Sequence, residues 1–312
     1  MSPDTVVTTQ VQGRRLKLSN LEKVLYPQEG FTKAEVLDYY VRIAPVLLPY
    51  LRARPLTLRR YPDGVDAASF FEKDVSRHAP AWVRTVRVPT PGSGKGAEAA
   101  DFAVIEDLPT LVWVANLASL ELHVPQWTVG PRGARRDPDL LVFDLDPGAP
   151  ATVVECCRVA ERLRELLTAD GLSVWPKTSG SKGLQLYVPV AVPGPERTSE
   201  YARAAAELLA RQTPRQVVAT MAKQARHGKV FIDWSQNNPK KTTVAPYSLR
   251  ARPRPTVSTP VTWAEVVDCA GPEDLVFTAP RVLERVEEFG DLFDGVLSDA
   301  TRERLPARPG AV

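Results

Sequence analysis

The stretch Leu140-Leu-Val-Phe-Asp-Leu-Asp-Pro147 decides the fold of this chain. Its apolar residues end in two aspartates and a proline, a pattern that predicts a buried strand over 140–146. Successive side chains of a strand face opposite sides of the sheet, so Asp144 and Asp146 share one face. Leu145, between them, is expected to point into the core.

Outward from this strand, helical and strand patterns alternate in a recognisable order. A helix, two strands joined by a glycine-rich loop, a second helix and a last strand follow, over 152–169, 173–178, 184–190, 199–211 and 229–234. The order β-α-β-β-α-β is the split βαβ of ferredoxin-like and RRM-like sheets. The sequence therefore predicts an α+β protein, and many unrelated functions use such sheets.

The first half of the chain predicts an N-terminal α/β subdomain. A helix should begin at Thr32, because Thr32 and Glu35 form a capping box ahead of apolar positions at helical spacing. We expect a single domain over 14–296, with the polar tails 1–13 and 297–312 outside it. Its parts are an N-terminal subdomain, a catalytic subdomain and a packing segment, over about 14–135, 136–258 and 259–296.

Composition narrows the class of protein without identifying a ligand. The 312 residues carry a net charge of +3 from 40 basic and 37 acidic side chains, too small a balance to indicate a polyanionic partner. The adjacent Cys156 and Cys157 suit neither a disulfide framework nor a zinc site and are expected in the core. No long apolar run or signal-peptide pattern occurs, which predicts a cytoplasmic protein without a membrane partner.

Three aspartates are candidates for a metal centre. Two neighbouring carboxylates repel each other unless a cation lies between them, and Mg²⁺ or Mn²⁺ prefers oxygen ligands. Asp233 lies in the apolar stretch Val230-Phe-Ile-Asp-Trp234, where a lone carboxylate is costly to bury, and this strand is expected beside the first. Asp144, Asp146 and Asp233 would then suit a two-metal phosphoryl-transfer centre. The alternatives are a strand end at which Asp144 and Asp146 cap the following turn, and an edge strand that exposes Asp233 to water.

Several polar segments near these aspartates could hold phosphate. Ser179-Gly-Ser-Lys-Gly183 has glycines that let backbone amides converge on an anion, with Ser179 and Lys182 as further donors, although an ordinary hairpin turn has the same composition. Gln236 and Arg250 follow Asp233 in a polar and basic region that a solvated loop would share. His123, near Trp127, is by itself more typical of a core histidine than of a ligand.

Two features of the first half could contact nucleic acid. Phe70 and Phe71 are adjacent and lie beside Lys73, so at least one ring could stack on a base, although both could be buried in a loop. Lys23 and Lys33 could hold a phosphate, although isolated lysines are usually surface charges.

Together and in this order, seven motifs resemble the polymerase domain of bacterial ATP-dependent DNA ligase D, a member of the archaeo-eukaryotic primase superfamily. The resemblance covers roughly 16–296. The motifs are Lys23-Val-Leu-Tyr-Pro27, Phe70-Phe-Glu-Lys73, His123-Val-Pro-Gln-Trp127, Asp144-Leu-Asp-Pro147, Thr178 to Gly183, Asp233-Trp-Ser-Gln-Asn237 and Lys241 to Arg250.

The resemblance implies a primase-polymerase fold and a DNA-directed nucleotidyltransferase that fills gaps and extends or pairs broken DNA ends in non-homologous end joining. It implies two Mn²⁺ or Mg²⁺ ions, NTP or dNTP substrates with ribonucleotides favoured, and as partners DNA ends and gaps with a 5′-phosphate, Ku and a DNA ligase. It also implies a nucleoid-associated monomer that can dimerise on DNA ends.

The resemblance also assigns roles to residues. Those that match metal ligands are Asp144, Asp146 and Asp233, and those that match nucleotide-binding positions are His123, Ser179, Lys182, Gln185, Gln236 and Arg250. Lys23 and Lys33 match lysines that bind a 5′-phosphate; Phe70, Phe71 and Lys73 match the template-stacking segment; the loops near Gly94 and Arg226 resemble those that steer primer and template.

Gln185 departs from the pattern, because many relatives have a histidine there and a glutamine cannot carry positive charge. Two other classes of function remain open. One is a Mg²⁺-dependent phosphatase with an aspartyl nucleophile, against which Pro147 and the lack of a parallel-sheet pattern argue. The other is a non-catalytic module that binds DNA ends, although three unneutralised aspartates would repel nucleic acid.

Overall fold

The computed structural model describes residues 6–90 and 98–310, and the predicted β-α-β-β-α-β order is present in it. Its strands form a six-stranded sheet in the order β13-β14-β12-β16-β15, with β18 beside β14. The bounds are β12 Leu140–Pro147, β13 Trp175–Thr178, β14 Leu184–Ala191, β15 Val217–Val218, β16 Val230–Asp233 and β18 Glu303–Arg304. This is the strand order of a ferredoxin-like sheet, with the short β15 and β18 added.

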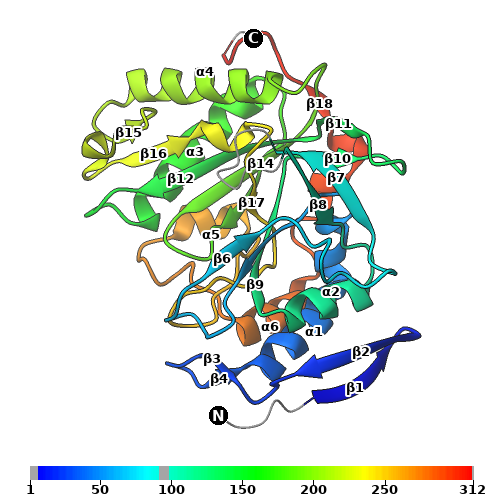
Figure 1. Cartoon of the computed structure of the whole chain (residues 1–312). Coiled ribbons are helices and arrows are strands. Elements are labelled where there is room, and N and C mark those ends of the chain that lie inside the picture. The colour runs from blue at the N-terminus through cyan, green and yellow to red at the C-terminus, as the bar shows by residue number, and fades with distance from the viewer. Residues whose placement is uncertain (1–5, 91–97, 311–312) are drawn as a thin grey trace.

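Strand β12 is the centre of this sheet. Both of its neighbours, β14 and β16, run antiparallel to it, so the parallel arrangement around the nucleophile strand of the phosphatase alternative is absent. Leu145 is fully buried, as predicted. Helices α3 (Val153–Ala169) and α4 (Arg197–Gln212) lie on one side of the sheet and the second sheet lies on the other (Figure 1).

The second sheet has four strands in the order β17-β9-β5-β6. Their bounds are β5 Thr57–Arg60, β6 Phe70–Glu72, β9 Ser119–Val124 and β17 Thr243–Val244. Strand β17 follows β16 along the chain, yet it pairs with β9 through Thr243 opposite Val124. The chain therefore passes directly from β16 in the six-stranded sheet to β17 at the edge of the smaller sheet, which connects the two sheets.

Helices α1 (Lys33–Leu51) and α2 (Leu108–Asn116) complete the N-terminal half. The capping box at the start of α1 is confirmed, since Thr32 accepts from the backbone of Glu35 and the Glu35 carboxylate accepts from the backbone N–H of Thr32. Four two-stranded sheets lie around this half: β1–β2 (Val6–Val11, Arg14–Ser19), β3–β4 (Val24–Tyr26, Phe31–Thr32), β7–β8 (Thr85–Pro89, Ala99–Ala103) and β10–β11 (Trp127–Val129, Arg135–Pro138).

The C-terminal segment packs as short helices. These are α5 (Trp263–Asp268), α6 (Ala279–Phe289), and the 3-10 turns Asp294–Leu297 and Asp299–Thr301; two further 3-10 turns, Lys223–Arg226 and Trp234–Asn237, flank β16. Tyr50 and Tyr247 both donate a hydrogen bond to Asp291, which ties this segment to α1.

The structure differs from the sequence-based expectation in both tails. Strand β1 pairs with β2 over six residue pairs, and β18 adds to the edge of β14. The tail patterns were too polar to reveal strands whose partners are an adjacent hairpin strand in one case and a distant sheet edge in the other. The expected loop near Gly94 lies outside the described residues.

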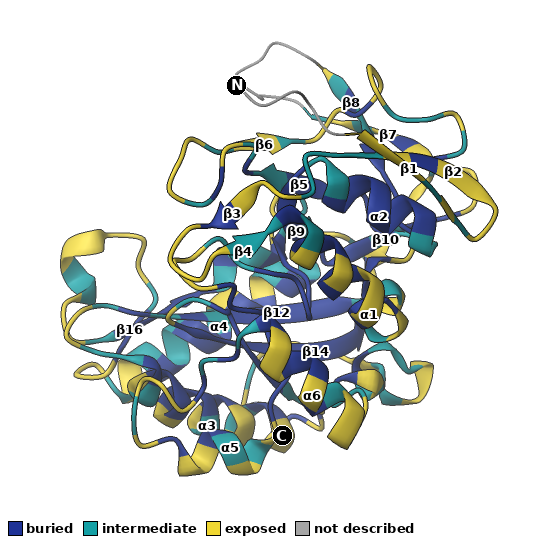
Figure 2. Cartoon of the chain, turned by 90° about the horizontal axis from the view of Figure 1, so that it is seen from below, coloured by how far each residue is buried: buried dark blue, intermediate teal, exposed yellow. Residues whose placement is uncertain are grey.

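The core is continuous across both halves. Figure 2 shows β12 and β14 as buried ribbons through the middle of the molecule, with exposed residues on the outer faces of the helices. Cys156, Cys157 and Cys269 are buried and unpaired, which confirms that the cysteines are core residues. No helix in the described ranges 6–90 and 98–310 has the length and apolarity needed to cross a membrane.

Candidate active site

A cavity of about 180 Å³ lies between the two sheets, and predicted residues of two kinds meet around it. Asp144 and Asp146 line it from β12, and the candidate nucleotide ligands line it from other elements. Its full lining is His123, Asp144, Asp146, Ser179, Ser181, Lys182, Gln185, Gln236, Thr242, Thr243, Val244 and Arg250. All six predicted nucleotide-binding residues, from four separate stretches of sequence, therefore face one space.

The three aspartates are neighbours on one face of the sheet. Asp144 of β12 stands directly opposite Asp233 of β16, and Asp146 is two residues further along β12. Burial and the charge of Asp146 raise the pKa of Asp144 to about 7. Burial and the charge of Asp233 also raise the pKa of Asp146. The site is thus an acidic cluster whose ionised form is disfavoured unless positive charge is close.

Asp233 is 8% exposed, so it is not the water-facing residue of the edge-strand alternative. Its Oδ1 accepts hydrogen bonds from the backbone N–H and hydroxyl of Ser235, and its Oδ2 accepts from Gln236 Nε2 at 2.8 Å. Lys241 Nζ lies 3.9 Å from the same Oδ2. Asp233 therefore has the polar partners that its burial requires.

All three candidate ligands are carboxylates that repel one another, and oxygen donors of this kind are the ones that a hard divalent cation prefers. In the part of the chain that the structure describes, however, no group of three or more His, Cys, Asp or Glu side chains is arranged so that it could hold a metal ion. The oxygens of Asp233 accept from Ser235 and Gln236 instead.

The loop between β13 and β14 is built as a compact turn beside the cavity. Gly180 has a φ of +66°, and a Cβ there would lie 2.6 Å from the backbone of Val257, so only glycine fits. The Ser179 hydroxyl oxygen accepts from the backbone N–H groups of Ser181 and Gly183 at 3.2 and 3.1 Å. Those two amides are thus used within the loop, and the donors left to face the cavity come mainly from side chains such as the exposed Lys182.

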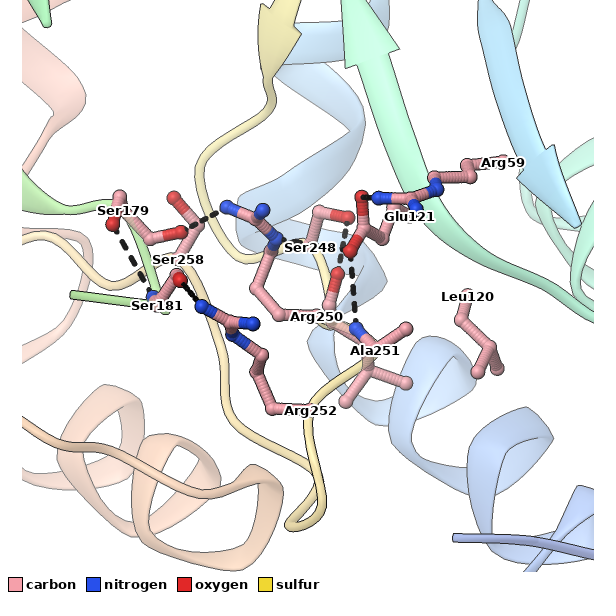
Figure 3. A network of polar contacts seen from close by, with 12 residues as sticks. Arg59, Leu120, Glu121, Ser179, Ser181, Ser248, Arg250, Ala251, Arg252 and Ser258 are labelled. Carbon is pink, nitrogen blue, oxygen red and sulfur yellow. Dashed lines mark hydrogen bonds and ion pairs between the residues drawn. The ribbon is translucent and has the colours of Figure 1, made fainter. Parts of the chain in front are cut away.

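Glu121 contacts two of the candidate nucleotide ligands, Arg250 and His123, and it also contacts Arg59. Figure 3 shows Glu121 with Arg250 and Arg59. Its Oε1 accepts from Arg250 Nε at 3.2 Å and from the backbone of Ala251 at 3.1 Å. Its Oε2 lies 2.9 Å from His123 Nε2 and 3.5 Å from Arg59 Nη1. Arg250 also donates to the carbonyl of Ser179, which links β9 to the loop after β13.

These contacts set the charges around the cavity. Burial would raise the pKa of Glu121, but the His123 hydrogen bond and the Arg250 charge outweigh it and lower that pKa well below its usual value. Burial lowers the pKa of His123 despite the nearby carboxylate. At neutral pH the cavity lining therefore has a neutral imidazole beside the basic side chains of Arg250 and Lys182, and the ionised Glu121 lies next to that lining, in contact with His123 and Arg250.

Gln185 and the buried Lys177 connect to the aspartates. Gln185 Nε2 donates to Asp144 Oδ1 at 3.0 Å, and Lys177 Nζ donates to Gln185 Oε1 at 2.6 Å. Both side chains are almost fully buried. The residue that departs from the family pattern is thus in direct contact with a candidate metal ligand.

The predicted stacking residues lie on β6, the edge strand of the smaller sheet. Phe70 and Phe71 are 44% and 52% exposed, which excludes the alternative in which both are buried. The Arg59 guanidinium lies 5.3 Å from the ring centre of Phe71, and the His123 ring meets the same ring edge-on at 5.7 Å. Lys73 is exposed beside them. An aromatic surface therefore reaches the cavity through His123.

Lys23 and Lys33 are close, since the backbone N–H of Lys33 donates to the carbonyl of Lys23 at 2.8 Å. Their side chains have different surroundings. Lys23 forms an exposed ion pair with Asp63 at 2.7 Å, whereas Lys33 is buried and donates to the carbonyl of Ser19 at 2.6 Å. Of the two, Lys23 is the more accessible to a ligand.

Sequence reasoning missed Glu121, Lys177 and Ser258, which form hydrogen bonds within the site. Glu121 has the same signal that singled out Asp233, a carboxylate inside the apolar strand Ser119–Val124. Lys177 and Ser258 gave no such signal. A larger cavity, about 1190 Å³, lies elsewhere, beside Arg54 and Arg302, and none of the predicted site residues line it.

Comparison with known proteins shows the family to which the chain is similar. The family model described as "LigD, primase-polymerase domain" matches residues 32–293. The multifunctional non-homologous end joining protein LigD of Mycolicibacterium smegmatis is 46% identical over 287 residues, which are 92% of this chain and 36% of that protein. The bifunctional non-homologous end joining protein LigD of Bacillus subtilis is 32% identical over 295 residues, 94% of this chain and 46% of that protein.

A solved structure is similar over the same region. The polymerase domain from Mycobacterium tuberculosis ligase D, in complex with DNA, matches with a TM-score of 0.85 and 41% identity. The match covers 91% of this chain and 99% of that one. The chain thus spans the full length of a polymerase domain but less than half the length of the two LigD relatives described above.

Proposed function

This chain belongs to the LigD primase-polymerase family, and we propose that its central cavity adds nucleotides to the 3′ end of a DNA primer opposite a template strand. Membership makes the chain a DNA-directed nucleotidyltransferase of a metal-dependent family that acts in non-homologous end joining. The observation that carries the proposal is the cavity itself, where two carboxylates and two cations face one space.

We assign the aspartates to the metal ions. Asp144 and Asp146 would hold two divalent cations together with Asp233, and either Mn²⁺ or Mg²⁺ fits an all-carboxylate donor set. When bound, such ions favour deprotonation of the attacking 3′-hydroxyl and neutralise the departing pyrophosphate. The raised pKa values of Asp144 and Asp146 support this role, because burial and the repulsion between the carboxylates raise them and a bound cation would offset both.

The other residues of the cavity would bind and orient the nucleotide. Arg250 and Lys182 are suited to the triphosphate as charged donors, and Arg250 is held in place by Glu121 and the Ser179 carbonyl. His123 is neutral and its Nε2–H donates to Glu121, so its Nδ1 is left to accept one hydrogen bond from the nucleotide without adding charge. Ser179 and Gln236 add neutral donors beside the triphosphate and Asp233.

DNA would lie across the smaller sheet and the surface next to it. Phe70 and Phe71 are exposed at an edge strand and can stack on template bases, with Lys73 near the backbone. Lys73, Lys240 and Lys241 also line a cavity of about 540 Å³, which shares Thr242 with the central one. We assign Lys23, with Lys33 behind it, to the 5′-phosphate of a gap.

The biological setting extends the proposal. We propose gap filling, end extension and pairing of DNA ends during end joining, with ribonucleotides favoured. Ku and a DNA ligase would act on the same break, and the monomer would pair with a second copy across two ends. These assignments rest on the family, whose LigD members carry further length beside the part that this chain matches.

Primer extension tests the proposal directly. A labelled primer on a gapped, 5′-phosphorylated template is incubated with each NTP and each dNTP, in Mn²⁺ and in Mg²⁺. We expect addition of the templated nucleotide, with the NTP used better than the dNTP. Tight DNA binding without any addition would instead support a non-catalytic module that binds DNA ends.

A further inference from the structure

Four side chains form one row across the six-stranded sheet. Lys177 of β13 stands opposite Gln185 of β14, Gln185 stands opposite Asp144 of β12, and Asp144 stands opposite Asp233 of β16. Residues directly opposite each other on neighbouring strands share a face and have closely spaced side chains. The row therefore leads from a fully buried lysine to two of the candidate metal ligands.

The hydrogen bonds along this row have a fixed direction. The Ser258 hydroxyl donates its proton to the carbonyl of Thr178 at 2.9 Å, so it can only accept from Lys177 Nζ, 2.5 Å away. Lys177 Nζ also donates to Gln185 Oε1 at 2.6 Å. The carboxamide of Gln185 is then held with its Nε2 toward Asp144, to which it donates at 3.0 Å.

We propose that Lys177, through Gln185, is a positioning residue that fixes the carboxylate of Asp144 for metal binding. Without the lysine, the Gln185 carboxamide could rotate and place its oxygen beside the carboxylate, where two acceptors repel each other. This role rests on the proposed function of Asp144 and gives Gln185 a purpose other than contact with the triphosphate.

The buried position of Lys177 is unfavourable in free energy, which supports a structural role for its side chain. Its side chain is completely buried, and its Nζ lies 5.3 Å from the ring centre of Tyr187. Burying an amine is unfavourable unless its donors are used, and here two are used by Gln185 and Ser258. Hydrogen-bonding partners of metal-ligating side chains orient those ligands, and their loss typically lowers metal affinity or activity by about 10- to 100-fold.

The test compares Lys177→Met, Gln185→Leu and the double variant. Each single variant replaces one polar side chain of the row by an apolar side chain of similar size, which removes its hydrogen bonds along the row. Mn²⁺ binding without nucleotide is followed by the electron paramagnetic resonance signal of the free ion. We expect each single variant to bind Mn²⁺ about tenfold more weakly, and the double variant to lose no more than either.

A matched control separates positioning from general loss of stability. Tyr201→Phe removes a buried hydrogen bond of 2.6 Å from α4 to Asp170 at the end of α3, outside the row, and it should lower the melting temperature while Mn²⁺ affinity is unchanged. The positioning role is wrong if the single variants bind Mn²⁺ as tightly as the wild type or more tightly. It is also wrong if the losses of the two single variants multiply in the double variant.

A measurement on the unaltered chain covers the case in which a variant fails to fold. In the nuclear magnetic resonance spectrum, the side-chain amide of Gln185 should shift when Mg²⁺ is added, and an amide that does not respond would also overturn the role. A wild-type chain that binds Mn²⁺ but never extends a primer would contradict the proposed function alone. The binding comparison would then still decide the role of Lys177.

Discussion

Replacing Glu121 by glutamine should weaken both the fold and nucleotide binding. The carboxylate is 1% exposed and accepts from Arg250, Ala251 and His123. A glutamine offers a single acceptor oxygen, so its amide can serve Arg250 and Ala251 only while its nitrogen faces His123. The neutral imidazole can accept there, and the main loss is then the negative charge beside Arg250.

The magnitude follows from these contacts. A hydrogen bond to a charged group contributes about 1.5–3 kcal/mol and one between neutral groups about 0.5–1.5 kcal/mol, so two weakened bonds predict a loss of about 2 kcal/mol in the free energy of unfolding. Glu121→Ala leaves Arg250 without its carboxylate partner, and breaking a buried pair in this way costs about 3–5 kcal/mol. Arg59 is discounted, because its side chain is 35% exposed and screened by water.

Urea unfolding, followed by tryptophan fluorescence, measures the first effect, and primer extension measures the second. Because Arg250 loses the contact that holds it, we expect KM for the incoming nucleotide to rise about tenfold in Glu121→Gln, with a smaller change in kcat. Arg42→Ala is a matched control, since its ion pair with Glu287 is exposed. A Glu121→Gln variant as stable as that control, with an unchanged KM, would show that Glu121 does not hold Arg250 for the nucleotide.

Three further predictions concern DNA, the template surface and metal. Lys23→Ala should weaken binding to gaps with a 5′-phosphate more than to gaps with a 5′-hydroxyl, measured by fluorescence anisotropy; equal loss on both rejects the phosphate role. Phe71→Ala should weaken binding to a template overhang by about 1–3 kcal/mol, with little change for blunt duplex. A variant that binds the overhang as tightly as the wild type does would argue against stacking. Because the folded pKa of Asp144 is raised to about 7, the metal-free protein should lose stability as pH rises from the unfolded pKa through that value. Mn²⁺ should therefore raise the melting temperature more at about pH 7.5 than at about pH 5, and the opposite order would contradict the assignment.

The core of the six-stranded sheet could be predicted from the sequence, because the patterns that indicate its strands are local. The apolar stretch before Asp144 and the period of two fixed the strand and its faces, and the β-α-β-β-α-β order placed Asp233 beside Asp144, as the structure confirms. The cap at Thr32 is equally local. Each of these features depends on residues a few positions apart or on a common strand order.

The rest depends on contacts between distant parts of the chain. Strand β17 pairs with β9 across more than a hundred residues, so neither strand predicts the other. Lys177 gains its role from Gln185 and from Ser258, 81 positions away. A buried lysine resembles a surface lysine until its partners are known, whereas Glu121 could have been recognised by the same burial argument as Asp233.

If the proposed function is right, nucleotide addition by this chain depends on the aspartates of the cavity. The most direct measurement is extension of a gapped, 5′-phosphorylated primer and template by the wild type and by Asp144→Asn, with DNA affinity measured in parallel. We predict templated addition by the wild type, loss of at least about a thousandfold in rate for Asp144→Asn, and DNA affinity within about threefold of the wild type. Equal extension by both proteins would show that Asp144 is not needed for nucleotide addition.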